Sequence, residues 1–273
     1  MTRTLRAQLA QETLKILNVG RYTSPGGATV LVSAVLREAV RGTVLYLPEH
    51  ELSFMPLAAE KPMQITVTNR RTLEAARDLS VGHKRVAALN FASAKHPGGG
   101  FLAGAQAQEE SLARATGLYA CLKAKFEFYA HHRERETAAY SDRVIFSPDV
   151  PVFRDDTGAL LEAPWTCSLI TAAAVNAASI RQNEPDLAGQ IDALMARRAR
   201  KVLAVAALHN IDALVLGAWG CGVYQNDPQR VALIFRELLR GEFAGVFARV
   251  DFAVLDREAD APTFAAFAGA FEI

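Results

Sequence analysis

The regular alternation of apolar strand patterns with helical patterns after Ile65 most constrains the fold of this chain. A strand pattern at 65–69 is followed by a helical stretch at 72–79 and a second strand pattern at 85–93. The runs 168–174 (SLITAAA) and 214–218 (LVLGA) are almost wholly apolar, as is typical of strands covered on both faces. The sequence therefore predicts a three-layer α/β/α domain with a mixed central sheet. We expect further strands at 143–146, 167–172, 213–217 and 249–255, and helices at 110–122, 189–208, 228–239 and 262–267.

The region before this alternation is predicted to be an accessory extension. Apolar periodicity indicates a helix at 5–17, and a break at 24–27 (SPGG) separates it from two β-rich runs at 29–35 and 43–47. We expect the extension to comprise residues 1–62 and the main domain residues 63–273.

The composition gives the chain a sizeable core and no overall field for a polyanion. Hydrophobic residues make up 51% of the 273 residues, which is enough for a sizeable core. The 30 Lys and Arg residues against 29 Asp and Glu residues give a net charge of +1, so no overall field draws the protein to nucleic acid. Any anionic ligand must be held by local geometry. We expect no direct nucleic-acid binding, and a monomer.

Membrane insertion and secretion are not expected. The longest apolar tract, 202–219, carries His209, Asn210 and Asp212 near its middle, which would be costly in hydrocarbon. The first residues lack the apolar core and small-residue cleavage site of a secretory signal. The sequence therefore predicts a cytoplasmic protein.

The cysteines and histidines predict neither disulfides nor a metal site. Cys121, Cys167 and Cys221 are widely spaced, form no C-x-x-C pair and are expected to be reduced thiols. The close pair His131 and His132 would point in different directions on a helix. We expect no metal and no cofactor. The charged run 131–136 (HHRERE) is interpreted as a solvated helix end or loop, with a basic guide for a polyanion as the alternative.

A loop of three glycines follows the strand at 85–93. Gly98, Gly99 and Gly100 remove every side chain from the loop, so backbone N–H groups can approach phosphate or ribose oxygens closely. A flexible surface turn is the alternative interpretation.

An acidic pair comes soon after this loop, at the start of the next predicted helix. Glu109 and Glu110 fall in the first turn, where carboxylates also stabilise a helix through its dipole. Their position after the glycines favours a functional role. Asn90, near the end of the preceding strand, is a candidate for hydrogen bonds to a sugar.

A second glycine-rich loop, 217–224 (GAWGCGVY), follows the strand at 213–217. Its glycines leave the backbone accessible, and such a loop can cradle a diphosphate, although it also fits an ordinary βα turn. Tyr224 is either a core aromatic residue or a ribose contact.

Together these motifs resemble those of the bacterial-type poly(ADP-ribose) glycohydrolases. The family signature is Gly-Gly-Gly, a spacer of six to eight residues and Gln-Glu-Glu. Here seven residues separate Gly100 from Gln108, Glu109 and Glu110. The loop 217–224 is similar to the family's diphosphate loop, which an aromatic residue closes.

The resemblance covers residues from about 65 to the C-terminus and implies the macrodomain fold, with ADP-ribose between the two loops. It implies that Glu110 is the catalytic acid/base, Glu109 its ribose-binding neighbour and Asn90 a contact to the terminal ribose. The other substrate-binding residues that it implies are Gly98, Gly99, Gly100, Gln108, Gly220, Cys221, Gly222, Val223 and Tyr224. Val175 stands where the family commonly has proline, which leaves the role of Asn176 open.

The function expected from this resemblance is hydrolysis of the ribose–ribose bonds of poly(ADP-ribose) from chain ends, with ADP-ribose as product. The alternatives are a non-catalytic ADP-ribose reader, which would not need a carboxylate at the glycosidic bond, and a hydrolase for single ADP-ribose groups. Phe101, Tyr140 and Phe264 are candidates to stack on adenine.

Overall fold

The computed structural model describes residues 1–53 and 62–272. Its main sheet has seven strands in the order β3-β6-β7-β5-β8-β9-β4. The pairs β7–β5, β5–β8, β8–β9 and β9–β4 are parallel, whereas β3–β6 and β6–β7 are antiparallel. The predicted mixed sheet is confirmed. The strands are β3 (Val44–Tyr46), β4 (Gln64–Thr68), β5 (Val86–Phe91), β6 (Val144–Arg154), β7 (Leu160–Ala172), β8 (Ala213–Leu216) and β9 (Arg249–Ala253).

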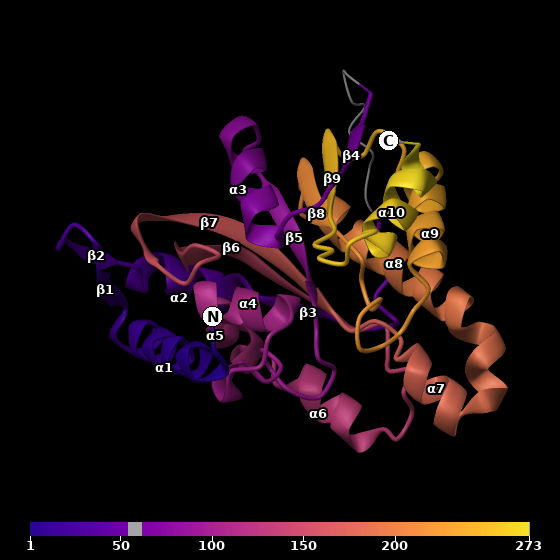
Figure 1. The fold of residues 1–273 in the computed structure, drawn as a ribbon, viewed down its shortest axis with the longest axis horizontal. Coiled ribbons are helices and arrows are strands. Elements are labelled where there is room, and N and C mark those ends of the chain that lie inside the picture. The colour runs from indigo at the N-terminus through magenta and orange to yellow at the C-terminus, as the bar shows by residue number, and fades with distance from the viewer. Residues whose placement is uncertain (54–61, 273) are drawn as a thin grey trace.

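Helices cover both faces of this sheet, as the predicted three layers require (Figure 1). On one side lie α3 (Thr72–Gly82), α4 (Gln108–Ala115) and α5 (Leu118–Ala124). On the other side lie α8 (Ile191–Leu208), α9 (Pro228–Arg240) and α10 (Pro262–Phe271). Two helices at the strand ends, α6 (Glu127–Glu134) and α7 (Ala177–Asn183), and the 3-10 turns η1 (Phe101–Ala103) and η2 (Pro185–Gln190) complete this part.

The side chains of β5 show how the sheet builds two cores. Ala87 and Leu89 point into the cluster formed with α8, α9 and α10, while Val86 and Ala88 point into the cluster formed with α3, α4 and α5. Alternate residues of a strand face opposite sides, so a central strand covered on both faces must be apolar throughout. Asn90, one residue before the end of β5, is the exception, and it lies at the candidate site.

The N-terminal region contains α1 (Arg3–Val19), the hairpin of β1 (Arg21–Thr23) and β2 (Thr29–Leu31), and α2 (Ser33–Gly42). It also supplies β3, which pairs with β6 at the edge of the main sheet. The predicted boundary at residue 62 stays a prediction, and the segment 54–61 lies outside the described residues.

Four predicted elements differ clearly from the structure. The strand predicted at 29–35 ends at Leu31, because α2 begins at Ser33 and buries Leu36 and Ala39 at helical spacing. The single helix predicted at 110–122 is two helices. The break at Thr116 arises because this residue bridges to Val152, which diverts the backbone from helical pairing. The strands predicted at 143–146 and 167–172 continue into a long hairpin of β6 and β7.

The charged run 131–136 is not a wholly solvated helix end. It overlaps α6, and His132 is fully buried, with its Nε2 atom 2.7 Å from Ser141 Oγ. Burial lowers the pKa of His132 to about 4. The predicted thiols Cys121, Cys167 and Cys221 are all free. Within the described ranges, no helix is long and apolar enough to cross a membrane.

Candidate active site

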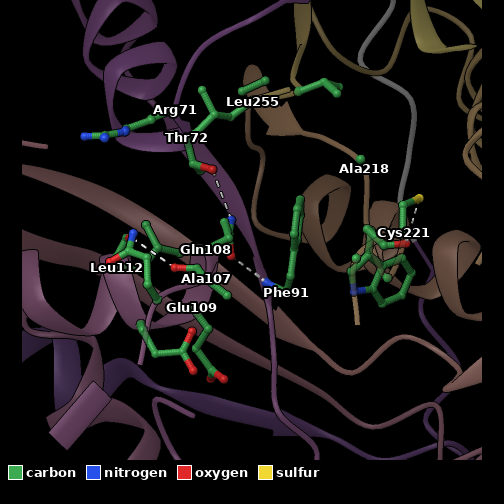
Figure 2. Close-up of a pocket in the computed structure, with 18 of the residues that line it drawn as sticks. Arg71, Thr72, Phe91, Ala107, Gln108, Glu109, Leu112, Ala218, Cys221 and Leu255 are labelled. Carbon is green, nitrogen blue, oxygen red and sulfur yellow. Dashed lines mark hydrogen bonds between the residues drawn. The ribbon is translucent and has the colours of Figure 1, made fainter. Parts of the chain in front are cut away.

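The candidate site is a cavity of about 540 Å³ at the carboxyl ends of the parallel strands. Open α/β sheets bind ligands at this edge because loops, rather than side chains of the core, surround it. Figure 2 shows Ala107, Glu109 and Leu112 on one side of the cavity, Ala218 and Cys221 on the other, and Phe91 between them. The acidic pair and the loop 217–224 therefore face each other across one cavity. Its described lining does not include Gly98, Gly99 or Gly100, so their predicted substrate contacts stay a prediction.

Glu109 lies almost fully buried at the floor of the site. Its Oε2 atom accepts a hydrogen bond from the Ser93 N–H at 2.6 Å, and its Oε1 atom accepts one from Asn90 Nδ2 at 3.2 Å. Burial raises the pKa of Glu109 from 4.5 to about 8, although these hydrogen bonds lower it. The geometry fixes this carboxyl group in one orientation beside the cavity.

The raised pKa predicts that replacing Glu109 with glutamine changes stability more favourably at alkaline pH than at acid pH. Between pH 4.5 and about 8 the unfolded chain loses the Glu109 proton and the folded chain keeps it, so native stability falls as pH rises. Glu109→Gln removes that loss. The quantity compared is the unfolding free energy of the variant minus that of the native protein. We expect this difference to be at least about 1 kcal/mol more favourable at pH 8.5 than at pH 4.5, or roughly 2–4 °C in Tm. Thermal unfolding of both proteins at the two pH values measures it, and an equal difference at both would contradict the burial argument.

Glu110 is only partly buried and lines the cavity. Its Oε1 atom accepts a hydrogen bond from the Gly100 N–H at 2.9 Å, which joins the acidic pair to the glycine loop. Gly99 has φ +59°, and a Cβ atom there would lie 2.3 Å from Glu110 Oε1 and 3.2 Å from Glu109 Oε2. Only glycine fits this position, because both the backbone conformation and the two carboxyl groups exclude a side chain.

Gln108 fastens the start of α4 to the end of β5. Its Oε1 atom accepts from the Phe91 N–H at 2.9 Å, and its Nε2 atom donates to Leu89 O at 2.7 Å and Thr72 Oγ1 at 3.1 Å. Both ends of the amide are thus engaged within the protein. The predicted contact between Gln108 and substrate stays a prediction, and the hydrogen bonds support a positioning role.

Asn90 lies behind Glu109 and has no solvent-exposed surface. Its Nδ2 atom donates to Glu109 Oε1 and Thr171 Oγ1, both at 3.2 Å. Among the described residues, its Oδ1 atom has no hydrogen-bond partner. A direct ribose contact of Asn90 stays a prediction, and its visible role is to orient Glu109.

The loop after β8 presents free backbone donors to the cavity. In the described parts of the chain, nothing accepts a hydrogen bond from the N–H groups of Gly222, Val223 and Tyr224. Gly220 has φ +77° and approaches Ala174 and Asn226 so closely that a Cβ atom would lie 2.6 Å from each. This arrangement suits a diphosphate, which such N–H groups bind well.

Two side chains of this loop, Cys221 and Tyr224, have raised pKa values. Burial raises the pKa of the Cys221 thiol to about 12, so it is not a ready nucleophile. The pKa of Tyr224 is also raised, first by burial and then by Tyr140, whose ring centroid lies 5.9 Å away. These values leave the backbone as the loop's main means of holding an anion.

Cavity residues at three strand ends were not predicted from the sequence. Arg71 and Thr72 follow β4, Leu255 follows β9, and Phe91 ends β5. The signal was available, because residues just after the predicted strands should gather at one edge of a parallel sheet. Among the three proposed adenine partners, Phe101 is fully buried against Ala10 and Ala113, so it is not free to stack on a base. The described lining of the cavity includes neither Tyr140 nor Phe264.

The first helix supports the loop between the glycines and the acidic pair. Arg3 Nε donates to Ala103 O at 3.0 Å, Arg6 Nε donates to Gly104 O at 2.8 Å, and Thr13 Oγ1 donates to Arg114 O at 2.6 Å. The N-terminal region is therefore part of the framework of the candidate site.

Comparisons with known proteins agree with this geometry. The family model for the catalytic domain of microbial-type PARG, that is, poly(ADP-ribose) glycohydrolase, matches residues 10–155, a little over half of the chain. The chain belongs to the microbial-type PARG family. The match begins in α1 and ends just after β6, so the family's pattern includes most of the N-terminal region and the acidic pair.

Solved structures extend the likeness over nearly the whole chain. Poly(ADP-ribose) glycohydrolase (PARG) from Thermomonospora curvata is 48% identical, with a TM-score of 0.94 over 98% of this chain and 100% of that one. The same enzyme bound to the inhibitor ADP-HPD is 49% identical, with a TM-score of 0.90 over 97% and 99% of the two chains. PARG from Deinococcus radiodurans in complex with ADP-ribose is 46% identical, with a TM-score of 0.80 over 87% and 97%. None of the curated proteins matches significantly. The fold is thus that of the bacterial PARG structures, as the sequence predicted.

Proposed function

We propose that this protein is a poly(ADP-ribose) glycohydrolase that uses Glu110 as its acid/base. One observation carries this proposal. A partly exposed carboxyl group lies on a side-chain-free glycine loop and faces a cavity whose opposite wall is a diphosphate-type loop. A binding module needs the diphosphate-type loop but no carboxyl group at the glycosidic bond, so the acidic pair favours an enzyme over a reader.

The reaction divides into two proton transfers at one residue. Glu110 donates a proton to the leaving hydroxyl oxygen as the bond from that oxygen to the anomeric carbon breaks, which leaves an oxocarbenium-like ribose. Water then adds to the anomeric carbon, and the ionised Glu110 accepts the proton that water loses. The products are free ADP-ribose and a chain shortened by one unit, and Glu110 is again protonated.

The remaining residues position the substrate for this step. Glu109, held by Ser93 and Asn90, is suited to hydrogen-bond ribose hydroxyl groups next to the reacting carbon. The free N–H groups of the loop 217–224 would hold the diphosphate. A bound diphosphate near the developing positive charge also stabilises the transition state electrostatically.

Binding of ADP-ribose and attack from chain ends also belong to this proposal. Relatives have been solved with ADP-ribose and with ADP-HPD, which supports an ADP-ribose unit as the cavity's ligand. Release from chain ends is what the likeness to the bacterial enzymes favours. The free thiols fit the cytoplasmic location expected from the sequence.

Product analysis on two substrates tests the assignment. The native protein should release ADP-ribose from free poly(ADP-ribose) chains and leave the last unit on a mono-ADP-ribosylated protein. Release from the mono-modified protein alone would show a hydrolase for single groups. Tight ADP-ribose binding without release from either substrate would show a reader.

A further inference from the structure

A second cavity, of about 350 Å³, lies next to the first and is rich in arginine. Arg6 of α1, Arg114 of α4, Arg154 of β6, and Arg71 and Arg257 from the two strand-end loops all line it. Asp155 and Asp156 are its acidic lining residues in the described part of the chain. A chain with a net charge of +1 thus concentrates five guanidinium groups at one place.

Three of these arginines have no carboxylate partner among the described residues. Arg6 donates to the carbonyl oxygens of Gly104 and Met1, at 2.8 Å in each case. Arg114, although its residue is nearly buried, donates only to neutral oxygens, including Ala105 O at 2.8 Å and Gln106 Oε1 at 2.6 Å. Arg257 is exposed and has no hydrogen bond within the described ranges. None of the three forms an ion pair in the described part of the chain, although Arg114 interacts electrostatically with Glu110.

The acidic side chains of this cavity are already engaged. Asp155 Oδ1 accepts from the N–H groups of Thr157 at 2.8 Å and Ala159 at 3.0 Å, within the turn between β6 and β7. Asp156 Oδ1 lies 3.7 Å from Arg71 Nη1 and forms an ion pair with it. Arg154 Nη2 forms an ion pair with Glu12 Oε2 of α1 at 2.5 Å. Among the described residues, Arg6, Arg114 and Arg257 are thus the arginines of this cavity that form no ion pair with a carboxylate.

The two cavities adjoin beside the proposed catalytic residue and share part of their lining. Gln106, Ser111, Arg71, Asp156 and Arg257 line both of them. Ser111 directly follows Glu110 on α4, so the arginine-lined cavity lies next to the proposed catalytic residue. In poly(ADP-ribose), the unit joined to the one being cleaved carries its own diphosphate.

We propose that the second cavity binds the diphosphate of the ADP-ribose unit adjoining the one held in the first cavity. The proposal rests on the proposed function, since it assigns a second unit of the same substrate. Guanidinium groups pair with phosphate oxygens through two parallel hydrogen bonds, and a site with three unpaired arginines suits two phosphate groups. The second cavity would thus distinguish polymer from monomer.

Charge removal at two of these arginines tests the proposal. Arg6→Gln and Arg257→Gln are made singly and together, and Arg41→Gln with Arg240→Gln serves as a control that removes two exposed arginines from outside both cavities. Each protein is assayed on poly(ADP-ribose) chains and on ADP-ribose that carries 4-nitrophenol at its anomeric carbon, which has no adjoining diphosphate. The quantity compared is the kcat/KM for chains divided by the kcat/KM for the small substrate.

We expect this ratio to fall at least tenfold in the double variant, with a weaker dependence on salt, and to stay within twofold in the control. A ratio within twofold of the native value in the double variant would overturn the proposal. If the native protein hydrolyses neither substrate, the proposed function fails and binding decides the inference. Native protein must then bind chains at least tenfold tighter than ADP-ribose, and the double variant must lose that preference, or the second site is rejected.

Discussion

Replacing Glu110 with glutamine is expected to lower the rate of ADP-ribose release by roughly 10²- to 10⁴-fold, the range typical of losing a general acid/base. Glutamine keeps the shape of the side chain and an oxygen that accepts from the Gly100 N–H, so the loop should hold its place. It has no proton to give the leaving oxygen. Binding of ADP-ribose should stay within about tenfold, or roughly 1.4 kcal/mol, because the loop 217–224 is unchanged. Product release and calorimetry measure the two effects.

Glu74→Gln is the matched control for this variant. Glu74 also lies in the first turn of a helix, α3, but it is exposed and outside the described lining of the cavity. Its loss removes a similar helix–dipole interaction, worth roughly 0.3–1 kcal/mol, and should leave the rate unchanged. Full activity of Glu110→Gln would end the assignment of Glu110.

Adding a single methyl group at Gly99 should be almost as damaging. In Gly99→Ala the new Cβ atom would lie 2.3 Å from Glu110 Oε1, so the loop and the acidic pair must separate. A displacement of about 1 Å in a catalytic group costs on the order of 10²-fold in rate. We expect kcat/KM for chains to fall by at least this factor, together with a measurable loss of ADP-ribose affinity.

Gly27→Ala separates the backbone cost of a side chain at positive φ from the contact of that side chain with the carboxyl groups. Gly27 has φ +87° in the turn between β1 and β2, but a Cβ atom there would meet nothing within 4 Å. It carries the backbone cost of a left-handed residue, about 1–2 kcal/mol, without any contact at the site. It should lower Tm and leave kcat/KM unchanged. Equal activities of the two variants would show that Gly99 is not required by the carboxyl groups.

The sequence allowed the acidic half of the site to be predicted because its parts are close along the chain. Only seven residues separate Gly100 from Gln108, so a strand, a loop and a helix start already bring Gly99 and Glu110 together. The apolar runs likewise predicted the central strands, because a strand covered on both faces has little choice of residue.

The rest of the site depends on contacts between distant segments. Nothing local to Arg6 shows that it reaches Gly104, 98 residues away. The burial of Asn90 and the two hydrogen-bonding ends of Gln108 depend on how β5, α3 and α4 pack. Polar residues beside a motif were therefore predicted as ligand contacts, whereas their visible contacts are with the protein.

The same long-range contacts give the N-terminal region a role that its sequence did not show. Through Arg3 and Thr13, α1 holds the loop and the helix that carry Glu110. The family match also begins within α1, so the family's pattern includes part of this helix.

Release of free ADP-ribose from poly(ADP-ribose) by the native protein, beside Glu110→Gln, tests the central claim most directly. Chromatography should show ADP-ribose as the product from the native protein and almost none from the variant, while both still bind ADP-ribose. Equal release by both proteins would contradict the role of Glu110, and release by neither, with ADP-ribose binding intact, would contradict the glycohydrolase itself.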